Sequence, residues 1–313
     1  MLARVADSLF WIGRYIERSE HLARFTKIQY FSALDAPLSH KEDFVLASLI
    51  HMVGLDPALA TMGEAEVLYR IGPDRQSEAS ICHAVSLART NARGARDMLS
   101  AELWENLNKF YHFVINYPAE EYKTRGLYDF THQVLVQCTL IKGAAENTLL
   151  HDEVWTLIQA GIYLERAIQV TRILRAKLAD IARIEQTLPD APAIEGYQIS
   201  TLLSATEGFD MSRRFYKSEV NRQMALAFLV INPVFPRSLS YAMRKLTTYL
   251  SRIHQGGTFI EPGSVDFVTG KLRARLQFLT AEELMQDTDH FLAEILDQLY
   301  QIGGLIHETY LRY

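Results

Sequence analysis

The same charged pattern occurs twice in this chain, 148 positions apart (17 to 165). Glu17-Arg18 and Glu165-Arg166 each lie inside an apolar pattern that repeats every three to four residues, which is typical of a buried helix. The matched pairs are Gly13 and Gly161, Tyr15 and Tyr163, Glu17 and Glu165, Arg18 and Arg166, and Arg24 and Arg172. The repeat predicts an internal duplication with pseudo-two-fold symmetry, whose halves cover about residues 1–150 and 151–313 and share one core.

Helix geometry constrains how these charges are paired. Adjacent residues of a helix point about 100° apart, so Glu165 and Arg166 cannot form a good ion pair with each other. A buried carboxylate without a partner is protonated or strongly destabilising. We therefore expect cross-helix contacts to arginines such as Arg93 and Arg237. Gly13 and Gly161, one turn before the glutamates, allow a second backbone to come close.

A second landmark accompanies each Glu-Arg pair. Arg93, in Asn91-Ala92-Arg93, lies 75 positions after Arg18, and Arg237, in Pro236-Arg237-Ser238, lies 71 positions after Arg166. Arg96 lies one turn beyond Arg93, on the same helical face. These positions predict a central charged cluster of Glu17, Arg18, Arg93, Arg96, Glu165, Arg166 and Arg237.

Two interpretations of this cluster stay open. In the first, the charges form buried ion networks that fix how the halves pack. In the second, some guanidinium groups stay free to bind a carboxylate or phosphate, so the cluster is an anion site. No catalytic residue is assigned by the pattern.

These motifs, together with the segment 100–108 (SAELWENLN), resemble the bacterial alpha-E family over residues 1 to 313. The resemblance implies an all-helical protein named for its Glu-Arg pair. It also implies a gene encoded beside a circularly permuted ATP-grasp ligase and a transglutaminase-like peptidase. It implies no particular biochemical activity.

The composition narrows the classes of function. Hydrophobic residues make up 49% of the chain and charged residues 22%, as in an ordinary soluble globular protein. The net charge is −5, from 32 basic and 37 acidic side chains, which argues against nucleic-acid binding. No apolar run reaches the roughly 20 residues of a membrane span, and there are only two cysteines. We expect a cytoplasmic protein with no membrane association and no disulfide framework.

Helix formers dominate, and no stretch alternates like a strand. We predict an all-α helical bundle forming a single domain, 1–313, without a sheet. The first helix is expected over residues 2–32, and a long helix over 151–184 carries the second Glu-Arg pair. A linker is expected over 185–195 and a loop over 254–267, where prolines and glycines interrupt the pattern.

No cofactor or metal is predicted. Carboxylate-bridged metal sites need Glu-x-x-His on two helices, whereas His21 follows Glu17 by four residues and its repeat counterpart is Gln169. The glycines of Gly263 to Gly270 are separated by six residues, but a phosphate-binding loop needs four.

The leading hypothesis is a helical accessory protein of an ATP-grasp ligase and transglutaminase-like peptidase system in peptide synthesis or modification. These two partners follow from the family resemblance alone. A small anionic or peptide ligand at the charged cluster is a separate expectation. One alternative is a stand-alone enzyme acting on a carboxylate or amide, with Glu17 or Glu165 as general base. Another is a homo-oligomeric scaffold. The aromatic residues Phe110, Tyr111, Phe113, Tyr117, Tyr122 and Tyr128 are a candidate exposed patch for a partner.

Overall fold

The structure is a computed structural model that describes residues 1–35, 41–187, 192–253 and 260–312. The described residues form fifteen α-helices and no strand, which confirms the predicted all-α fold. The first half contains α1 (Ala3–Asp35), α2 (Lys41–Val53), α3 (Glu64–Ile71), α4 (Ile81–Gly94), α5 (Ala101–Asn116), α6 (Ala119–Glu121) and α7 (Leu127–Thr148). The second half contains α8 (Glu153–Thr187), α9 (Pro192–Ala205), α10 (Phe209–Tyr216), α11 (Arg222–Val230), α12 (Leu239–Ile253), α13 (Val265–Phe278), α14 (Ala281–Gln286) and α15 (Thr288–Ile306). Short 3-10 or π turns cover Pro57–Met62, Arg96–Met98, Tyr122–Gly126 and His307–Leu311.

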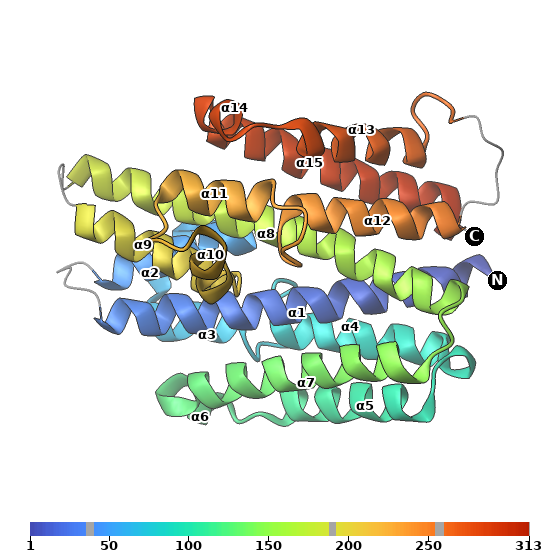
Figure 1. The fold of residues 1–313 in the computed structure, drawn as a ribbon. Coiled ribbons are helices and arrows are strands. Elements are labelled where there is room, and N and C mark those ends of the chain that lie inside the picture. Colours follow the sequence, from blue (N-terminus) through green and yellow to red (C-terminus); the bar gives the residue numbers. More distant parts are fainter. Residues whose placement is uncertain (36–40, 188–191, 254–259, 313) are drawn as a thin grey trace.

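Two long helices, α1 and α8, form the centre of the molecule. They have 33 and 35 residues and pack extensively against each other. In Figure 1 they lie between one layer that contains α4, α5 and α7 and another that contains α12, α13 and α15. Both helices carry buried apolar residues on several faces, because neighbouring helices cover them on several sides. The two helices that carry the Glu-Arg pairs are therefore the core elements of the fold.

The two halves arrange their helices around these central elements in a similar way. Helix α1 packs against α4 and α7, and α5 covers both of these. In the second half α8 packs against α12 and α15, and α13 contacts both. This correspondence of α4 with α12, α5 with α13 and α7 with α15 agrees with the predicted repeat. The duplication of the whole halves stays a prediction.

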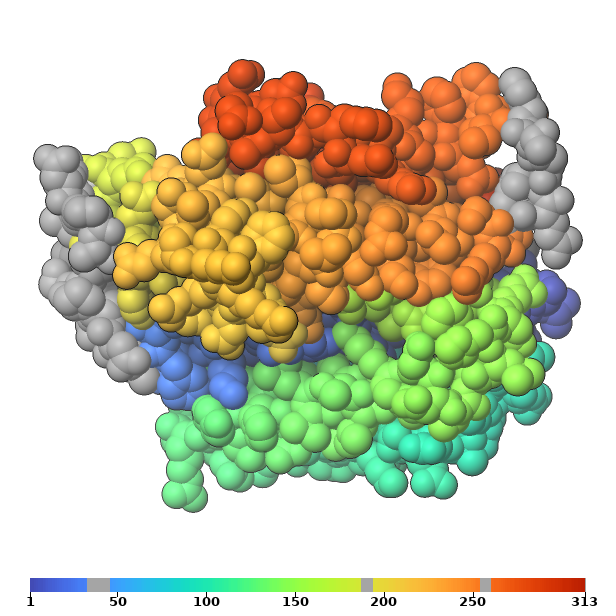
Figure 2. Space-filling model, viewed as in Figure 1, coloured from blue at the N-terminus to red at the C-terminus, as the bar shows by residue number. Residues whose placement is uncertain are grey.

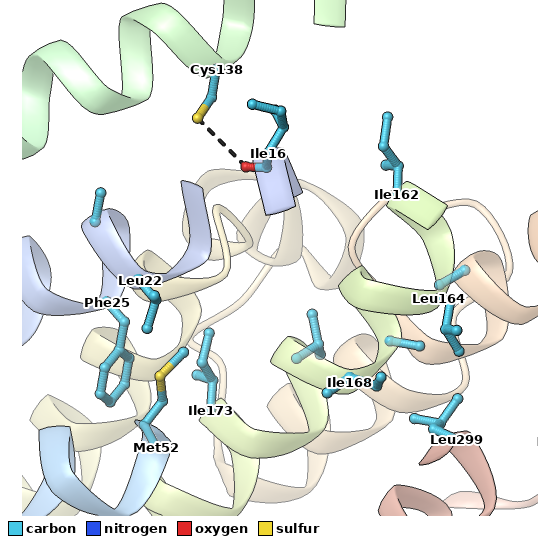
Figure 3. Packing of buried hydrophobic residues seen from close by; sticks show 14 of the residues in the cluster. Ile16, Leu22, Phe25, Met52, Cys138, Ile162, Leu164, Ile168, Ile173 and Leu299 are labelled. Atoms are coloured by element: carbon cyan, nitrogen blue, oxygen red, sulfur yellow. Dashed lines mark hydrogen bonds between the residues drawn. The ribbon is translucent and has the colours of Figure 1, made fainter. Parts of the chain in front are cut away.

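The buried apolar side chains form one continuous cluster through both halves. Figure 3 shows how it joins the elements: Leu22 and Phe25 of α1 lie near Met52 of α2, and Ile173 of α8 projects into the same region. Among the described helices, none combines the length and the apolar composition of a membrane span.

The predicted boundaries are close to the observed ones at the long helices. Helix α8 extends to Thr187 and α9 begins at Pro192, so helices occupy most of the predicted 185–195 linker. Its residues 188–191 lie outside the described residues. Residues 254–259 of the predicted 254–267 loop also lie outside them, and α13 begins at Val265.

The predicted aromatic patch is mostly core. Phe110 and Tyr122 are buried. Phe113 and Tyr117 pack against the buried ring of Phe130, with ring centroids 5.7 and 5.0 Å away. Tyr128 is the exposed member. These rings therefore stabilise the packing of α5 on α7 instead of forming an exposed surface.

Candidate functional site

The centre of the candidate site is the crossing of α1 and α8, where two glycines meet the opposite backbone. A Cβ atom built on Gly13 would lie 2.1 Å from the carbonyl oxygen of Ile158. One built on Gly161 would lie 2.0 Å from the carbonyl oxygen of Phe10. Phe10 and Ile158 are themselves 148 positions apart, so the close contact is reciprocal. The predicted close approach at both glycines is confirmed.

Four residues after Gly161, the carboxylate of Glu165 is fully buried and saturated with hydrogen bonds. Arg18 donates from Nε to Oε1 at 2.7 Å and from Nη2 to Oε2 at 3.2 Å. Arg14 Nε donates to Oε2 at 2.8 Å, and Gln169 Nε2 donates to Oε1 at 2.7 Å. This glutamate on α8 is thus held mainly by arginines of α1.

Glu17 on α1 has the mirror arrangement. Arg166 donates from Nε to Oε1 at 2.6 Å and from Nη2 to Oε2 at 3.2 Å. His21 Nε2 lies 3.1 Å from Oε1, and Lys142 of α7 donates to Oε2. The 148-residue offset therefore relates the two ion pairs: Arg18 corresponds to Arg166, and Glu165 corresponds to Glu17. As predicted, the glutamate and arginine of one pair do not bind each other. Their partners are the residues of the other pair, and not Arg93 or Arg237 as expected.

The aromatic and amide neighbours repeat as well. The Arg18 guanidinium lies 5.5 Å from the ring centroid of Tyr15, and that of Arg166 lies 4.7 Å from that of Tyr163. His21 contacts Glu17 where its counterpart Gln169 contacts Glu165. This cation–π support from the side chain three residues earlier on the same helix orients both arginines toward the opposite helix.

The electrostatic environment keeps both glutamates charged. Burial alone would raise their pKa, but Arg166 and Lys142 hold the pKa of Glu17 well below its usual range. Arg18 and Arg14 do the same for the pKa of Glu165. A carboxylate that is sealed from solvent and hydrogen-bonded on both oxygens has little capacity to accept a proton. The geometry therefore argues against either glutamate as a general base.

The Glu17 side extends into a wider ion network. Arg24 Nη2 donates to Glu20 Oε1 at 2.8 Å, while its Nη1 lies 2.7 Å from Glu207 Oε1. Arg237 contacts the carboxylates of both Glu20 and Glu207, and Lys142 contacts Glu20. In Figure 2 part of α1 is visible in a depression between the surfaces of α7 and α10–α12, the elements that border this network.

Two of the predicted cluster residues lie elsewhere. Arg93 is exposed on the last turn of α4, and no described carboxylate lies within ion-pair distance of it. Arg96 donates to the carbonyl of Leu99 at 3.2 Å and lies 5.2 Å from the Trp104 ring centroid. The structure brings together the other predicted residues, Glu17, Arg18, Glu165, Arg166 and Arg237.

The loops that precede α4 and α12 show that Arg93 and Arg237 are not equivalent positions of the repeat. Ser80 and Ser238 are the matching positions: each hydroxyl donates to the carbonyl six residues earlier, and each accepts the N–H three residues later. The residues six positions earlier, Asp74 and Asn232, each also accept an N–H two residues on. Arg237 therefore corresponds to Ala79.

Arg14, Glu20, Gln169 and Lys142 are among the network members that lie outside the predicted cluster. Arg14 and Glu20 lie three residues from Glu17 on the same helix, so helical spacing could have indicated them. Gln169 follows Glu165 by four residues, so helical spacing also indicates that these two side chains can meet. Lys142 reaches the site from α7, and no spacing in the sequence connects it to α1.

Among the described residues, no group of three His, Cys, Asp or Glu side chains is arranged so that it could hold a metal ion. Glu17, Glu20 and His21 lie close together. Their neighbours are the cationic groups of Lys142 and Arg237, which would repel a metal.

We expect the stability of the protein to fall with acid in two stages. The pKa of His21 is lowered from its ordinary 6.5 by burial, so protonation favours the unfolded chain and stability is lost as pH falls below 6.5. The pKa values of Glu17 and Glu165 are also lowered, so their contribution is lost as pH falls below about 4.5.

The variant His21→Gln isolates the first stage, because Gln169 already fills this position in the other half. Urea unfolding at pH 5 to 8 should show a wild-type slope of up to about 1.4 kcal/mol per pH unit below pH 6.5. The variant should lack that added slope. Equal pH profiles for both proteins would contradict the assignment to His21.

The chain is similar to a family of helical domains and to longer mycobacterial proteins. A family model described as a predicted alpha-helical domain with a conserved ER motif matches residues 1–311. The uncharacterized protein Mb2597 of Mycobacterium bovis is 25% identical over 334 residues, covering 98% of this chain. The uncharacterized protein Rv2567 of Mycobacterium tuberculosis is 24% identical over the same coverage. The chain spans only 37% of the length of each of these relatives. No solved structure matches the chain.

Proposed function

The chain belongs to the Alpha-E family, and from this premise we propose that it is a helical accessory protein of a peptide-modifying system. In that system an ATP-grasp ligase and a transglutaminase-like peptidase perform the chemistry, and the present chain binds to them. The identity of these partners rests on the family resemblance alone, and one observation supports the accessory role. In the mycobacterial relatives a segment similar to this whole chain makes up 37% of a longer polypeptide. A unit that acts beside another protein is expected to occur fused to further polypeptide.

The geometry of the Glu-Arg cluster supports an accessory role over catalysis by the cluster. Glu17 and Glu165 are fully buried and paired with arginines, so they serve to join α1 to α8. A stand-alone enzyme that used either of them as general base would need a carboxylate that solvent and substrate can reach. The cluster is in our proposal the structural centre of the fold.

An exposed apolar surface offers a place for the partner. Met211, Phe215 and Val234 are exposed around a hollow of about 370 Å³, whose inner wall includes Phe228 and Phe235. Exposed aromatic and methionine side chains beside a pocket are typical of the centre of a protein interface. We propose that the ligase docks on this surface.

Affinity purification tests the proposal. The tagged protein, purified from its native lysate at low and moderate salt, should co-elute with an ATP-grasp protein identified by mass spectrometry. Phe215→Asp should reduce the recovered ligase at least tenfold, because it places a charge in the apolar contact. Phe278→Asp is the matched control: Phe278 is 76% exposed, against 55% for Phe215, and lies at the end of α13.

Absence of ligase and peptidase from the wild-type eluate, in a lysate shown to contain both, would contradict the accessory role. Equal recovery with both variants would reject this docking surface. A dimer in light scattering of the purified protein, without either partner in the eluate, would favour the homo-oligomeric scaffold.

A further inference from the structure

A cavity of about 570 Å³ opens on the Glu165 side of the central cluster. Its lining comes from α1, α3, α8 and α15, from the end of α2 and from the 72–80 segment that precedes α4. Its volume is in the range of small-molecule sites. The charged and polar side chains that line it are Arg14, Arg18, Arg70, Asp74, Gln76, Ser77, Glu78, Glu165, Gln169, Arg172 and Tyr300.

Two arginines of the lining have guanidinium N–H groups that no carboxylate of the described residues neutralises completely. Of the four arginines in the lining, Arg70 is paired with Glu66 and Arg18 binds Glu165, which already accepts four hydrogen bonds. Arg14 directs Nε to Glu165, and among the described residues no acceptor lies within reach of its Nη atoms. Arg172 donates from Nε to the Tyr300 hydroxyl at 2.9 Å, and no described carboxylate pairs with it. Such guanidinium groups are suited to bind a carboxylate.

The other half of the molecule shows what this half lacks. Arg172 corresponds to Arg24 by the 148-residue offset, and Arg24 binds the carboxylate of Glu20 four residues before it. The residue four positions before Arg172 is Ile168, which corresponds to Glu20 and lines the cavity. Where one half has a built-in buried carboxylate, the other has an apolar side chain and an empty volume beside arginines.

A buried acceptor completes the lining. Gln169 is almost wholly buried, and its Nε2 is committed to Glu165 at 2.7 Å. The Oε1 atom is buried without a hydrogen-bond partner among the described residues. A buried acceptor without a donor is costly, so a ligand with an N–H group would relieve it. Asp74 and Glu78 on the same lining also suit a cationic or N–H group.

We propose that this cavity binds the carboxylate of an amino acid or short peptide. The carboxylate takes the place near Arg14 and Arg172 that Glu20 fills in the other half. The amine or amide N–H of the same ligand donates to Gln169 or to the carboxylates of the 72–80 segment. The site stands on the cavity and its arginines, independently of any partner protein.

Titration calorimetry on the purified full chain tests this with alanyl-alanine and its C-terminal amide as probes. The free acid should bind and the amide should bind at least tenfold more weakly, because the amide removes the anion. Arg172→Gln should weaken binding of the free acid at least tenfold. Arg24→Gln, the matched change in the other half, should leave binding unchanged.

Ile168→Glu supplies the missing carboxylate from the chain itself and should abolish binding, while Ile168→Gln, of the same size, should retain it. If Ile168→Glu does not fold, Arg172→Gln decides. Equal binding of acid and amide would overturn the proposal, as would wild-type affinity in Arg172→Gln or no binding at millimolar probe. Binding of inorganic phosphate without the dipeptide would overturn the ligand class. A failed partner purification leaves these outcomes unaffected.

Discussion

Alanine at Gly13 or Gly161 is expected to destabilise the protein severely. The new Cβ would lie 2.1 or 2.0 Å from a backbone carbonyl oxygen of the opposite helix, and backbone cannot rotate away as a side chain can. Helices α1 and α8 would have to separate. The ion pairs one turn later, Arg18 to Glu165 and Arg166 to Glu17, would then lengthen inside an apolar core. We expect a loss above about 4 kcal/mol in the free energy of unfolding.

Urea unfolding followed by circular dichroism measures this effect. The matched control is Gly304→Ala in α15, where a Cβ meets nothing within 4 Å. That change should stabilise the protein by roughly 0.5–1 kcal/mol, because alanine is the better helix former. A Gly13→Ala protein with wild-type stability would show that the helices do not cross at this glycine.

The second large effect is expected from Glu17→Gln and Glu165→Gln. Each change keeps the size of the side chain but leaves buried arginine charge unpaired: Arg166 in the first case, Arg14 and Arg18 in the second. Breaking a buried ion pair in this way costs about 3–5 kcal/mol. Both variants should show this loss in urea unfolding, since the environments are reciprocal.

An exposed glutamate provides the control for these variants. Glu105 lies 3.7 Å from Lys109 in an ion pair that is exposed to solvent. Glu105→Gln should change stability by no more than about 0.5 kcal/mol. Losses of that small size for the two buried glutamates would mean that their charges are not essential to the packing of α1 on α8.

The cluster was partly predictable because its causes are local. Two charges in an apolar helical pattern require burial with partners, and a glycine one turn earlier allows two backbones to meet. The 148-residue offset then relates Glu17 to Glu165. The structure agrees with each of these steps at the crossing of α1 and α8.

The other residues of the site could not be predicted, because they meet only through tertiary packing and no spacing in the sequence indicates it. Arg93 was matched to Arg237 by approximate spacing, but the loops before α4 and α12 correspond through Ser80 and Ser238. These loops share capping hydrogen bonds and differ in most residue types. Lys142 enters the site from α7 only because that helix lies against α1.

A double-mutant cycle on Glu17 tests the central claim most directly. Glu17→Gln is combined with Arg166→Met, and separately with Arg18→Met, and the free energies of unfolding are compared. The reciprocal arrangement predicts a coupling above about 1 kcal/mol for Glu17 with Arg166, which donates to it at 2.6 Å. It predicts a much smaller coupling with its sequence neighbour Arg18, which binds Glu165. A larger coupling to Arg18 than to Arg166 would contradict the account.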